Sequence, residues 1–395
     1  MNKKYIVFSS LLSSLALILP AAPSIAAVKQ REVTIVFQAP KTGPNGQVGL
    51  DQVIGVKIAI DQYNSTNPRV KIKLKEVDDT GNPAIAATKA QENILDQSVV
   101  GVIGPITSGA AKASFPAYKA GKLAMVCTAC AVPALTDPTD PGNGLPVFHR
   151  VVLNDSFQAP ALVDYAISGV TNPKIFLADD STTYGKSLAA LNTTYTQSKS
   201  LSVVGTDSIP SATVDFSATV AKVLDSDANV VIFSGYYGDS GHFVKALRAA
   251  GYKGIYAASA GSVIQSFITE AGDTAAEGAR LTIQQTPFDL NASKEQMALY
   301  NKYADGVPVT NKQYVTEGFN AATVFITLIK SGSTSRSQIL SRIGRASYVG
   351  LGGMKFSFDP FGDIVGGAPF ARWTVENGKL KYIKPVSNRK VSTKR

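Results

Sequence analysis

The sequence predicts an α/β protein made of two doubly wound lobes, each built on a parallel sheet. Predicted strands and helices alternate along the chain, and the alternation runs once before and once after residue 150. Several of the strands are continuous apolar runs rich in β-branched residues, which is typical of parallel sheets covered on both faces. The 395 residues, 45% of them hydrophobic and 17% charged, are enough for two ordinary globular domains.

The first half of the chain contains four predicted strands. A glycine- and proline-rich segment from Pro40 to Gly49 predicts a loop before the first helix. The strand at 70–77 alternates apolar and charged residues, so one of its faces is expected to be wet. The predicted strands cover residues 32–37, 70–77, 99–103 and 123–126, and the helices cover 53–63, 83–94 and 110–118.

The second half repeats the pattern. Its predicted strands cover residues 174–178, 201–206, 230–234 and 255–258, and its helices cover 184–198, 216–224 and 240–250. Right-handed crossovers place the carboxyl ends of strands and the amino ends of helices at one edge of each sheet. Two such edges facing one another would form a crevice, and crevices at these edges are where α/β sheets bind ligands.

The first residues predict a cleaved secretory signal peptide at 1–26. Lys3 and Lys4 precede an apolar run from Tyr5 to Leu19, and small residues follow up to Ala26. The alternative is a membrane anchor, but the run is shorter than the about 20 apolar residues that a span needs. Without a cysteine near the cleavage site, we expect a protein released into the periplasm.

The net charge of +10 does not predict nucleic-acid binding, because it is concentrated at the carboxyl end. A basic end on a nearly neutral body is usually a solvated segment. We therefore expect no nucleic-acid partner. The basic residues of the last 21 positions are Lys379, Lys381, Lys384, Arg389, Lys390, Lys394 and Arg395.

Catalytic and metal-binding patterns are absent from the sequence. His149 and His242 are the only histidines, and no P-loop, G-x-S-x-G or G-x-G-x-x-G motif occurs. We therefore predict no enzyme activity, no metal and no cofactor. Cys127 and Cys130 can pair as a disulfide in an oxidising compartment or remain buried thiols. A redox role for this C-x-x-C pair is the sharper alternative, because such motifs lower a thiol pKa.

Short motifs in a particular order give the chain a resemblance to a known family. It resembles the leucine/isoleucine/valine-binding family of periplasmic ABC-importer substrate-binding proteins, which have the type I periplasmic binding protein fold. The resemblance covers essentially the whole chain after residue 26. The motifs are Thr42-Gly43-Pro44, residues 78–83, 102–105, 133–136, Phe148-His149-Arg150, Asp155-Ser156-Phe157-Gln158, 180–185, 331–336 and 358–363.

The resemblance implies two lobes joined by a hinge of three crossing segments. Lobe 1 would take residues 27–152 plus 284–366, and lobe 2 would take residues 153–283 plus 367–395. A small polar solute, an amino acid in most of the family, would be trapped between the lobes. The expected partners are this ligand and an inner-membrane ABC permease, and the expected state is a monomer. A ligand sensor of the same fold is the alternative.

The segment from Gly104 to Gly109 is the strongest candidate for ligand contact. It follows a strand and opens a helix, so free backbone N–H groups and the helix dipole favour an anion there. We predict ligand contacts from Thr107, Ser108 and Gly109, and the resemblance implies that Ser108 holds the ligand carboxylate. Alternatively, Thr107 or Ser108 caps the helix, and both roles can hold together.

The remaining predicted ligand contacts come from the resemblance. They are Ala129, Cys130 and Ala131 in the first lobe and Tyr184 and Tyr236 in the second, with aromatic core packing as the alternative for the tyrosines.

Two positions depart from the family pattern. Ala260 stands where the family has an acid for the ligand ammonium, and Val48 replaces a tyrosine. Either Asp239 substitutes for that acid, or the ligand is an amide, a urea-like solute, or an aromatic or aliphatic carboxylate without an ammonium group.

Overall fold

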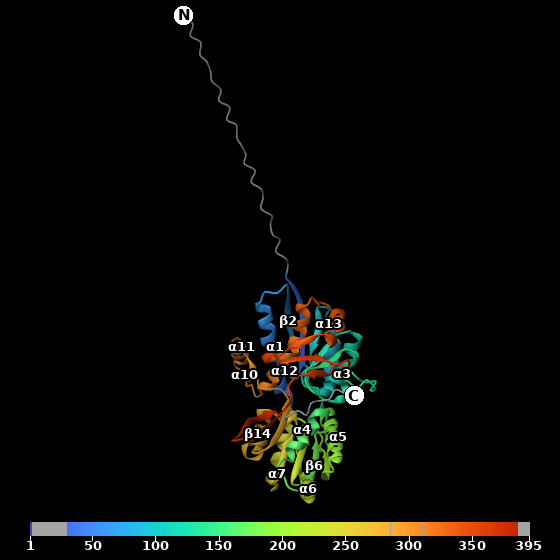
Figure 1. Ribbon diagram of the computed structural model, residues 1–395, viewed down its shortest axis with the longest axis vertical. Helices are drawn as coiled ribbons and strands as arrows, with labels where there is room; N and C mark the ends of the chain where they lie inside the picture. Colours follow the sequence, from blue (N-terminus) through green and yellow to red (C-terminus); the bar gives the residue numbers. More distant parts are fainter. Residues whose placement is uncertain (2–29, 285, 310, 386–395) are drawn as a thin grey trace.

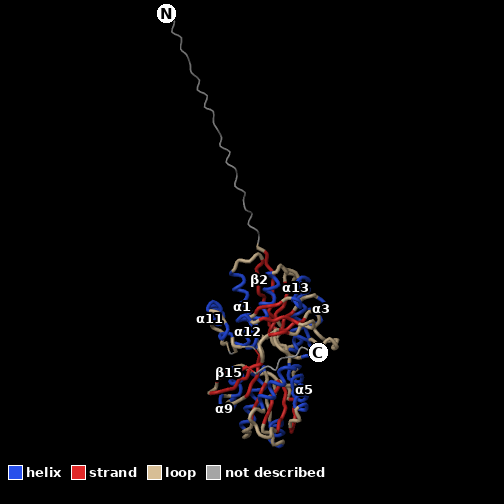
Figure 2. The backbone as a smooth tube through the Cα atoms, viewed as in Figure 1, coloured by secondary structure: helices blue, strands red, loops and turns tan. Residues whose placement is uncertain are grey.

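The computed structural model describes residue 1 and residues 30–284, 286–309 and 311–385. Apart from Met1, the predicted signal peptide lies outside these residues, as does the end of the basic tail. The predicted α/β fold with parallel sheets is confirmed. Figure 1 shows two lobes, one containing β2, α1 and α3 and the other containing β6, α5 and α7, and Figure 2 shows strands with surrounding helices in both lobes.

The first lobe is built on a parallel sheet of five strands in the order β2-β1-β3-β4-β5. The central strand β3 is buried at all five positions, as a continuous apolar run requires. The strands are β1 (Arg31–Ala39), β2 (Val70–Asp78), β3 (Val99–Ile103), β4 (Met125–Cys127) and β5 (Phe148–Arg150). The helices between them are α1 (Gly46–Ser65), α2 (Pro83–Leu95) and α3 (Ser108–Ala120), with the 3₁₀ turn η1 (Pro133–Leu135) before β5.

The second lobe is built on a mixed sheet of seven strands in the order β15-β14-β10-β9-β8-β6-β7. Five strands are parallel, and β14 and β15 add to the edge in antiparallel pairing. The strands are β6 (Lys174–Asp179), β7 (Ser202–Ser208), β8 (Val230–Ser234), β9 (Ile255–Ala258), β10 (Arg280–Gln284), β14 (Phe370–Glu376) and β15 (Lys379–Pro385). The helical segments are α4 (Asp155–Ala166), α5 (Thr183–Ser198), α6 (Ser217–Asp225), α7 (Tyr237–Ala249), η2 (Ala260–Ser262), α8 (Gln265–Ala271) and α9 (Asp273–Ala276).

The chain between β10 and β14 forms further helices and a small antiparallel sheet, β11-β12-β13. The most extensive helix pairing in the described chain joins α1 to α12 of this segment. The elements are α10 (Phe288–Asn291), α11 (Lys294–Ala304), α12 (Lys312–Lys330), α13 (Arg336–Arg342), η3 (Ile343–Arg345), β11 (Ser347–Val349), η4 (Leu351–Gly353), β12 (Lys355–Phe358) and β13 (Ile364–Gly366). Within the described ranges, no helix combines the length and the apolar character that a membrane crossing demands.

The prediction that residues 40–49 form a loop is wrong from Gly46 onward, because α1 begins there. Gly43 does lie in a turn, but Gly49 serves close packing within the helix. A Cβ at Gly49 would lie 1.8 Å from the Pro40 carbonyl oxygen, so only glycine lets this helix turn pass the loop. The helix predicted to begin at Ser240 also begins earlier, at Tyr237, and Tyr236 is its N-cap residue.

Glycines also bring α1 and α12 together. A Cβ at Gly55 would lie 1.9 Å from the Val315 carbonyl oxygen, and one at Gly318 would lie 2.0 Å from the Gln52 carbonyl oxygen. The two backbones therefore touch at this crossing, and Gln52 and Glu317 become neighbours.

Replacing Gly55 with alanine should destabilise the protein by about 1–3 kcal/mol, because the helices must separate to admit the methyl group. Urea unfolding followed by circular dichroism measures this. Gly238→Ala is the matched control, since a Cβ at Gly238 has no neighbour within 4 Å. The control should be neutral or slightly stabilising, and equal losses in both variants would contradict the close-packing explanation.

Candidate ligand-binding site

A pocket lies between the two sheets and is lined from both lobes. From the first lobe and α12, the lining residues are Asn45, Val48, Ile106, Thr107, Ala129, Ala131, Tyr314 and Glu317. Val152 and Leu153 line it from the segment that joins β5 to α4. From the second lobe come Gln158, Tyr184, Tyr236, Ala260, Gly261, Ile283, Gln284 and Phe370. No lysine, arginine or histidine is among these lining residues of the described chain.

The start of α3 is one wall of this pocket. Thr107 is the N-cap residue, and its Oγ1 accepts a hydrogen bond from the Ala110 N–H at 3.3 Å, so the predicted capping role is present. The N–H groups of Ser108 and Gly109 donate to no other described residue. The Ser108 Oγ is also buried without a hydrogen-bond partner within the described chain. Three donors at a helix start are therefore left for a ligand.

The predicted residues of this segment do not all line the same space. Thr107 lines the pocket, whereas Ser108 is 1% exposed and is not among the lining residues. Gly109 lines the larger outer cleft that adjoins the pocket, where a Cβ would lie 3.3 Å from the Thr183 Oγ1 of the second lobe.

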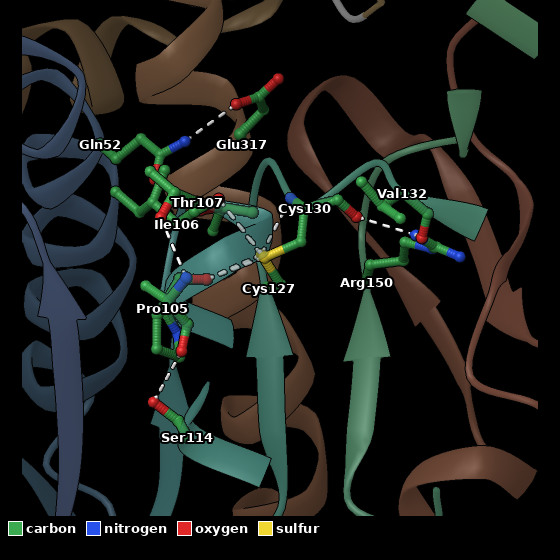
Figure 3. Close-up of a disulfide and its surroundings, with 12 residues drawn as sticks. Gln52, Pro105, Ile106, Thr107, Ser114, Cys127, Cys130, Val132, Arg150 and Glu317 are labelled. Atoms are coloured by element: carbon green, nitrogen blue, oxygen red, sulfur yellow. Dashed lines mark hydrogen bonds between the residues drawn. A yellow bond between two sulfur atoms is a disulfide. The ribbon is translucent and has the colours of Figure 1, made fainter. Parts of the chain in front are cut away.

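The loop after β4 is another wall. Ala129 and Ala131 line the pocket, whereas Cys130 is fully buried and does not. Figure 3 shows the disulfide that joins Cys130 to Cys127, and the Cys130 sulfur lies 3.0 Å from the Pro105 carbonyl oxygen. The disulfide therefore ties the start of this loop to the end of β4, and both sulfur atoms lie against the segment that leads into α3.

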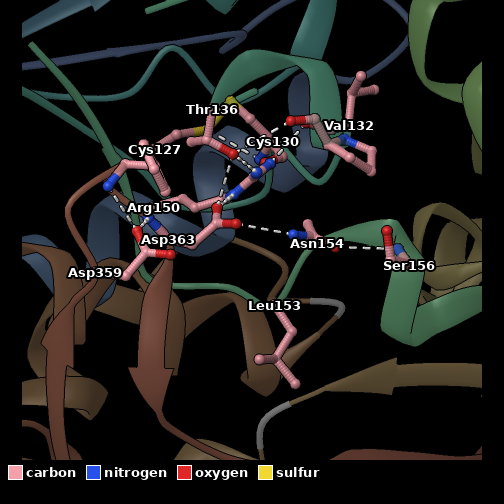
Figure 4. A network of polar contacts seen from close by, with 12 residues as sticks. Cys127, Cys130, Val132, Thr136, Arg150, Leu153, Asn154, Ser156, Asp359 and Asp363 are labelled. Carbon is pink, nitrogen blue, oxygen red and sulfur yellow. Dashed lines mark hydrogen bonds and ion pairs between the residues drawn. A yellow bond between two sulfur atoms is a disulfide. The ribbon is translucent and has the colours of Figure 1, made fainter. Parts of the chain in front are cut away.

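Arg150 holds the same loop from its other side, as Figure 4 shows. Its guanidinium is fully buried and donates to the carbonyl oxygens of Cys130 and Val132 at 2.9 and 2.8 Å. Its Nε donates to the Asp363 carboxylate at 2.5 Å. The other oxygen of Asp363 accepts from the Asn154 side chain, in the segment that joins the two lobes, at 2.9 Å. One buried cation thus connects the pocket loop to a crossing segment.

Tyr184 and Tyr236 line the pocket from the second lobe, with ring centroids 5.3 Å apart. The Gln158 amide donates to the Tyr184 hydroxyl at 2.9 Å, and its oxygen accepts from the Ala260 N–H at 3.1 Å. Burial raises the pKa of Tyr184, so its hydroxyl stays protonated. These tyrosines can cover an apolar ligand group and still donate hydrogen bonds.

The acid suggested from the sequence, Asp239, lies elsewhere. It lines the outer cleft and not the pocket, and its carboxylate accepts from the Ser211 hydroxyl and the Ala212 N–H, each at 2.9 Å. Both partners belong to its own lobe, so the carboxylate is already engaged.

Sequence reasoning did not find several residues of the pocket. Tyr314 and Glu317 lie on one face of α12, and the Tyr314 hydroxyl donates across to the Ala260 carbonyl oxygen of the second lobe at 3.1 Å. Gln158 belongs to a motif that carried the family resemblance, but nothing in the motif marked it as a pocket residue. Gln284 and Phe370 end and begin strands next to the crossings between lobes.

Asp155, beside the pocket, should make stability depend on pH. Burial raises its pKa from the ordinary 3.8 to about 7. Between these values the unfolded chain is ionised while the folded protein keeps the proton, so stability falls as pH rises. Asp155→Asn should therefore gain about 2–3 kcal/mol more stability at pH 8 than at pH 5. Urea unfolding at both pH values tests this, with exposed Asp225→Asn as the control. Equal changes at the two pH values would contradict it.

Two α/β lobes with a pocket of apolar and polar side chains between them define a two-lobed solute-binding protein, and the comparisons with known proteins agree. A family model for periplasmic binding proteins matches residues 32–379. The Leu/Ile/Val-binding protein homolog 3 of Brucella melitensis is 27% identical over 375 residues, covering 90% of this chain and 98% of that protein. The chain therefore belongs to the periplasmic binding protein family.

Solved structures share the fold. A branched-chain amino acid transporter substrate-binding protein from Streptococcus pneumoniae, in complex with isoleucine, matches with a TM-score of 0.77 at 20% identity, covering 90% of this chain and all of that one (100%). A solute-binding protein from R. palustris in complex with 4-hydroxybenzoate matches with a TM-score of 0.74 at 20% identity, covering 90% and 97%. Proteins of this fold thus hold both amino acids and aromatic acids.

Proposed function

We propose that this protein binds a small solute with a carboxylate group, in the first place a branched-chain amino acid, and delivers it to an inner-membrane ABC permease. It would act as a periplasmic monomer, exported by the signal peptide at residues 1–26, and by binding alone, without catalysis or a cofactor. The relatives named for leucine, isoleucine and valine support this choice of ligand.

The observation that carries the proposal is the free start of α3 at the pocket between the lobes. The N–H groups of Ser108 and Gly109 and the Ser108 hydroxyl lack partners in the described chain, and a buried donor without a partner is costly. A ligand carboxylate would satisfy these donors and would meet the positive end of the helix dipole. Thr107, Ala129 and Ala131 complete the site on this side, with Cys130 held behind them by its disulfide.

The second lobe completes the contacts when the lobes close. Tyr184 and Tyr236 would cover the ligand body, and because they belong to the other lobe, the bound solute favours the closed arrangement. We propose the lobe boundaries given above, 27–152 plus 284–366 and 153–283 plus 367–395. The pairing of β14 with β10 supports the return of the last segment to the second lobe.

An aromatic carboxylate is the second candidate. Four aromatic side chains, Tyr184, Tyr236, Tyr314 and Phe370, line the pocket. The position at Ala260, without an acid, also fits a ligand that lacks an ammonium group.

A thermal-shift series tests the proposal, because a ligand that binds only the folded state raises the melting temperature. The series should include amino acids, amides, urea and aromatic and aliphatic carboxylates. We expect carboxylates, and branched-chain amino acids above all, to raise the melting temperature by several degrees. A response to uncharged amides or urea alone would contradict the proposed carboxylate site.

A further inference from the structure

We propose that Glu317 binds the ammonium group of the ligand, so that the natural ligand is a carboxylic acid that also carries an ammonium group. This inference rests on the proposed function and names the ligand class of the same pocket. It moves the recognition of the ammonium group from the second lobe to α12, which packs against the first.

The position and contacts of Glu317 carry the inference. Its side chain lines the pocket, although the residue is only 2% exposed. Its Oε2 accepts from the Gln52 amide at 2.9 Å, the contact drawn in Figure 3. No described residue donates to its Oε1, which leaves that oxygen as an acceptor for a ligand.

A hydrogen-bond relay determines how Gln52 faces Glu317. The Thr128 hydroxyl donates to the Gln52 Oε1 at 2.5 Å, so the amide nitrogen of Gln52 turns toward Glu317. The glycine-mediated contact of α1 with α12 keeps Gln52 and Glu317 at this distance. Thr128 belongs to the pocket loop after β4. The two hydrogen bonds therefore connect the Glu317 carboxylate, through Gln52, to a wall of the ligand site.

Charge balance favours a cationic partner. Burial raises the pKa of Glu317 well above its usual range, and the Gln52 hydrogen bond is the only opposing contribution. Buried carboxylates are normally paired with a cation, but no lysine, arginine or histidine is among the described lining residues. A ligand ammonium beside Glu317 would favour its ionised form and complete an ion pair, while the ligand carboxylate would lie at the start of α3.

Asp239 and Asp155 are less suitable than Glu317. Asp239 lies in the outer cleft with its carboxylate occupied by two donors of its own lobe. Asp155 is fully buried and does not line the pocket, and its Oδ1 accepts from Gln158. Among the described lining residues, Glu317 is the one that carries a carboxylate, so it is the acid that a ligand ammonium in this pocket would meet.

The experiment compares ligands that differ only in the ammonium group. Isothermal titration calorimetry would measure leucine against 4-methylpentanoate and phenylalanine against 3-phenylpropanoate, with the wild type and with Glu317→Gln. The substitution keeps the shape of the side chain and removes its ability to ionise beside an ammonium group. We expect the wild type to bind at least one amino acid on the order of 100-fold more tightly than its deaminated analogue, and Glu317→Gln to lose most of that preference.

The outcomes separate the two proposals. Two results would overturn the role of Glu317 and leave the proposed function standing. One is that the wild type and a folded Glu317→Gln bind an amino acid equally well. The other is that the wild type prefers the deaminated acids. If the variant does not fold, wild-type binding of the deaminated acids as tight as that of the amino acids would still overturn the proposal. Loss of amino-acid binding in Asp239→Asn alone would assign the ammonium group to the second lobe. Binding of none of the four acids would count against the proposed function itself.

Discussion

Arg150→Met is expected to destabilise the protein by about 3–5 kcal/mol, the usual cost of removing one partner of a buried charge pair. The fully buried guanidinium makes hydrogen bonds to Asp363, Thr136 and the carbonyl oxygens of Cys130 and Val132. Methionine fills similar space but donates nothing, so the carbonyl oxygens of Cys130 and Val132 would lose the guanidinium donor and Asp363 would lose its counter-charge. Urea unfolding followed by circular dichroism measures the loss.

Lys222→Met provides the matched comparison. Lys222 pairs with Asp207 at 2.8 Å, but its side chain is 56% exposed. Removing an exposed pair should cost less than about 1 kcal/mol, because water already screens the charges. If the two variants lost similar stability, the buried network around Arg150 would not be holding the pocket loop to the crossing segment.

Ser108→Ala is expected to weaken binding of the ligand about 10- to 100-fold, as measured by calorimetry with the best-binding carboxylate. A hydrogen bond to a charged group contributes about 1.5–3 kcal/mol, and about 1.4 kcal/mol corresponds to tenfold in affinity. The Ser108 Oγ has no partner in the described protein, so the stability of the free protein should stay the same or rise slightly.

Ser335→Ala removes a hydroxyl from another helix start, and it should lower stability without affecting ligand binding. The Ser335 Oγ accepts from the Gln338 N–H of α13 at 3.4 Å, away from the pocket. Its loss should cost about 1 kcal/mol of stability and leave binding unchanged. If Ser108→Ala lowered stability without weakening binding, Ser108 would be a structural residue only.

The interior of each sheet could be predicted closely from the sequence. The strands at 99–103, 230–234 and 255–258 match the structure residue for residue, because strands buried on both faces are apolar throughout. The start of α1 could not, since glycines that allow close packing look like glycines of a loop. The sheet β11-β12-β13 was not predicted either, because strands of three or four residues are too short to show a period.

The candidate site could be predicted where it follows from local structure. Thr107 begins a helix after a strand, and this order alone predicts its place at the sheet edge. Glu317 could not be found this way, because it lies in the middle of a helix and reaches the pocket only through the packing of α12 on α1. Asp239 illustrates the converse, since an acid close in sequence to the site is turned to donors of its own lobe.

The most direct test of the account is a crystal structure of the protein with the carboxylate that gives the largest thermal shift. We predict that the ligand lies between the lobes with its carboxylate oxygens about 3 Å from the N–H groups of Ser108 and Gly109. A ligand in the outer cleft, or one whose carboxylate points away from the start of α3, would contradict it.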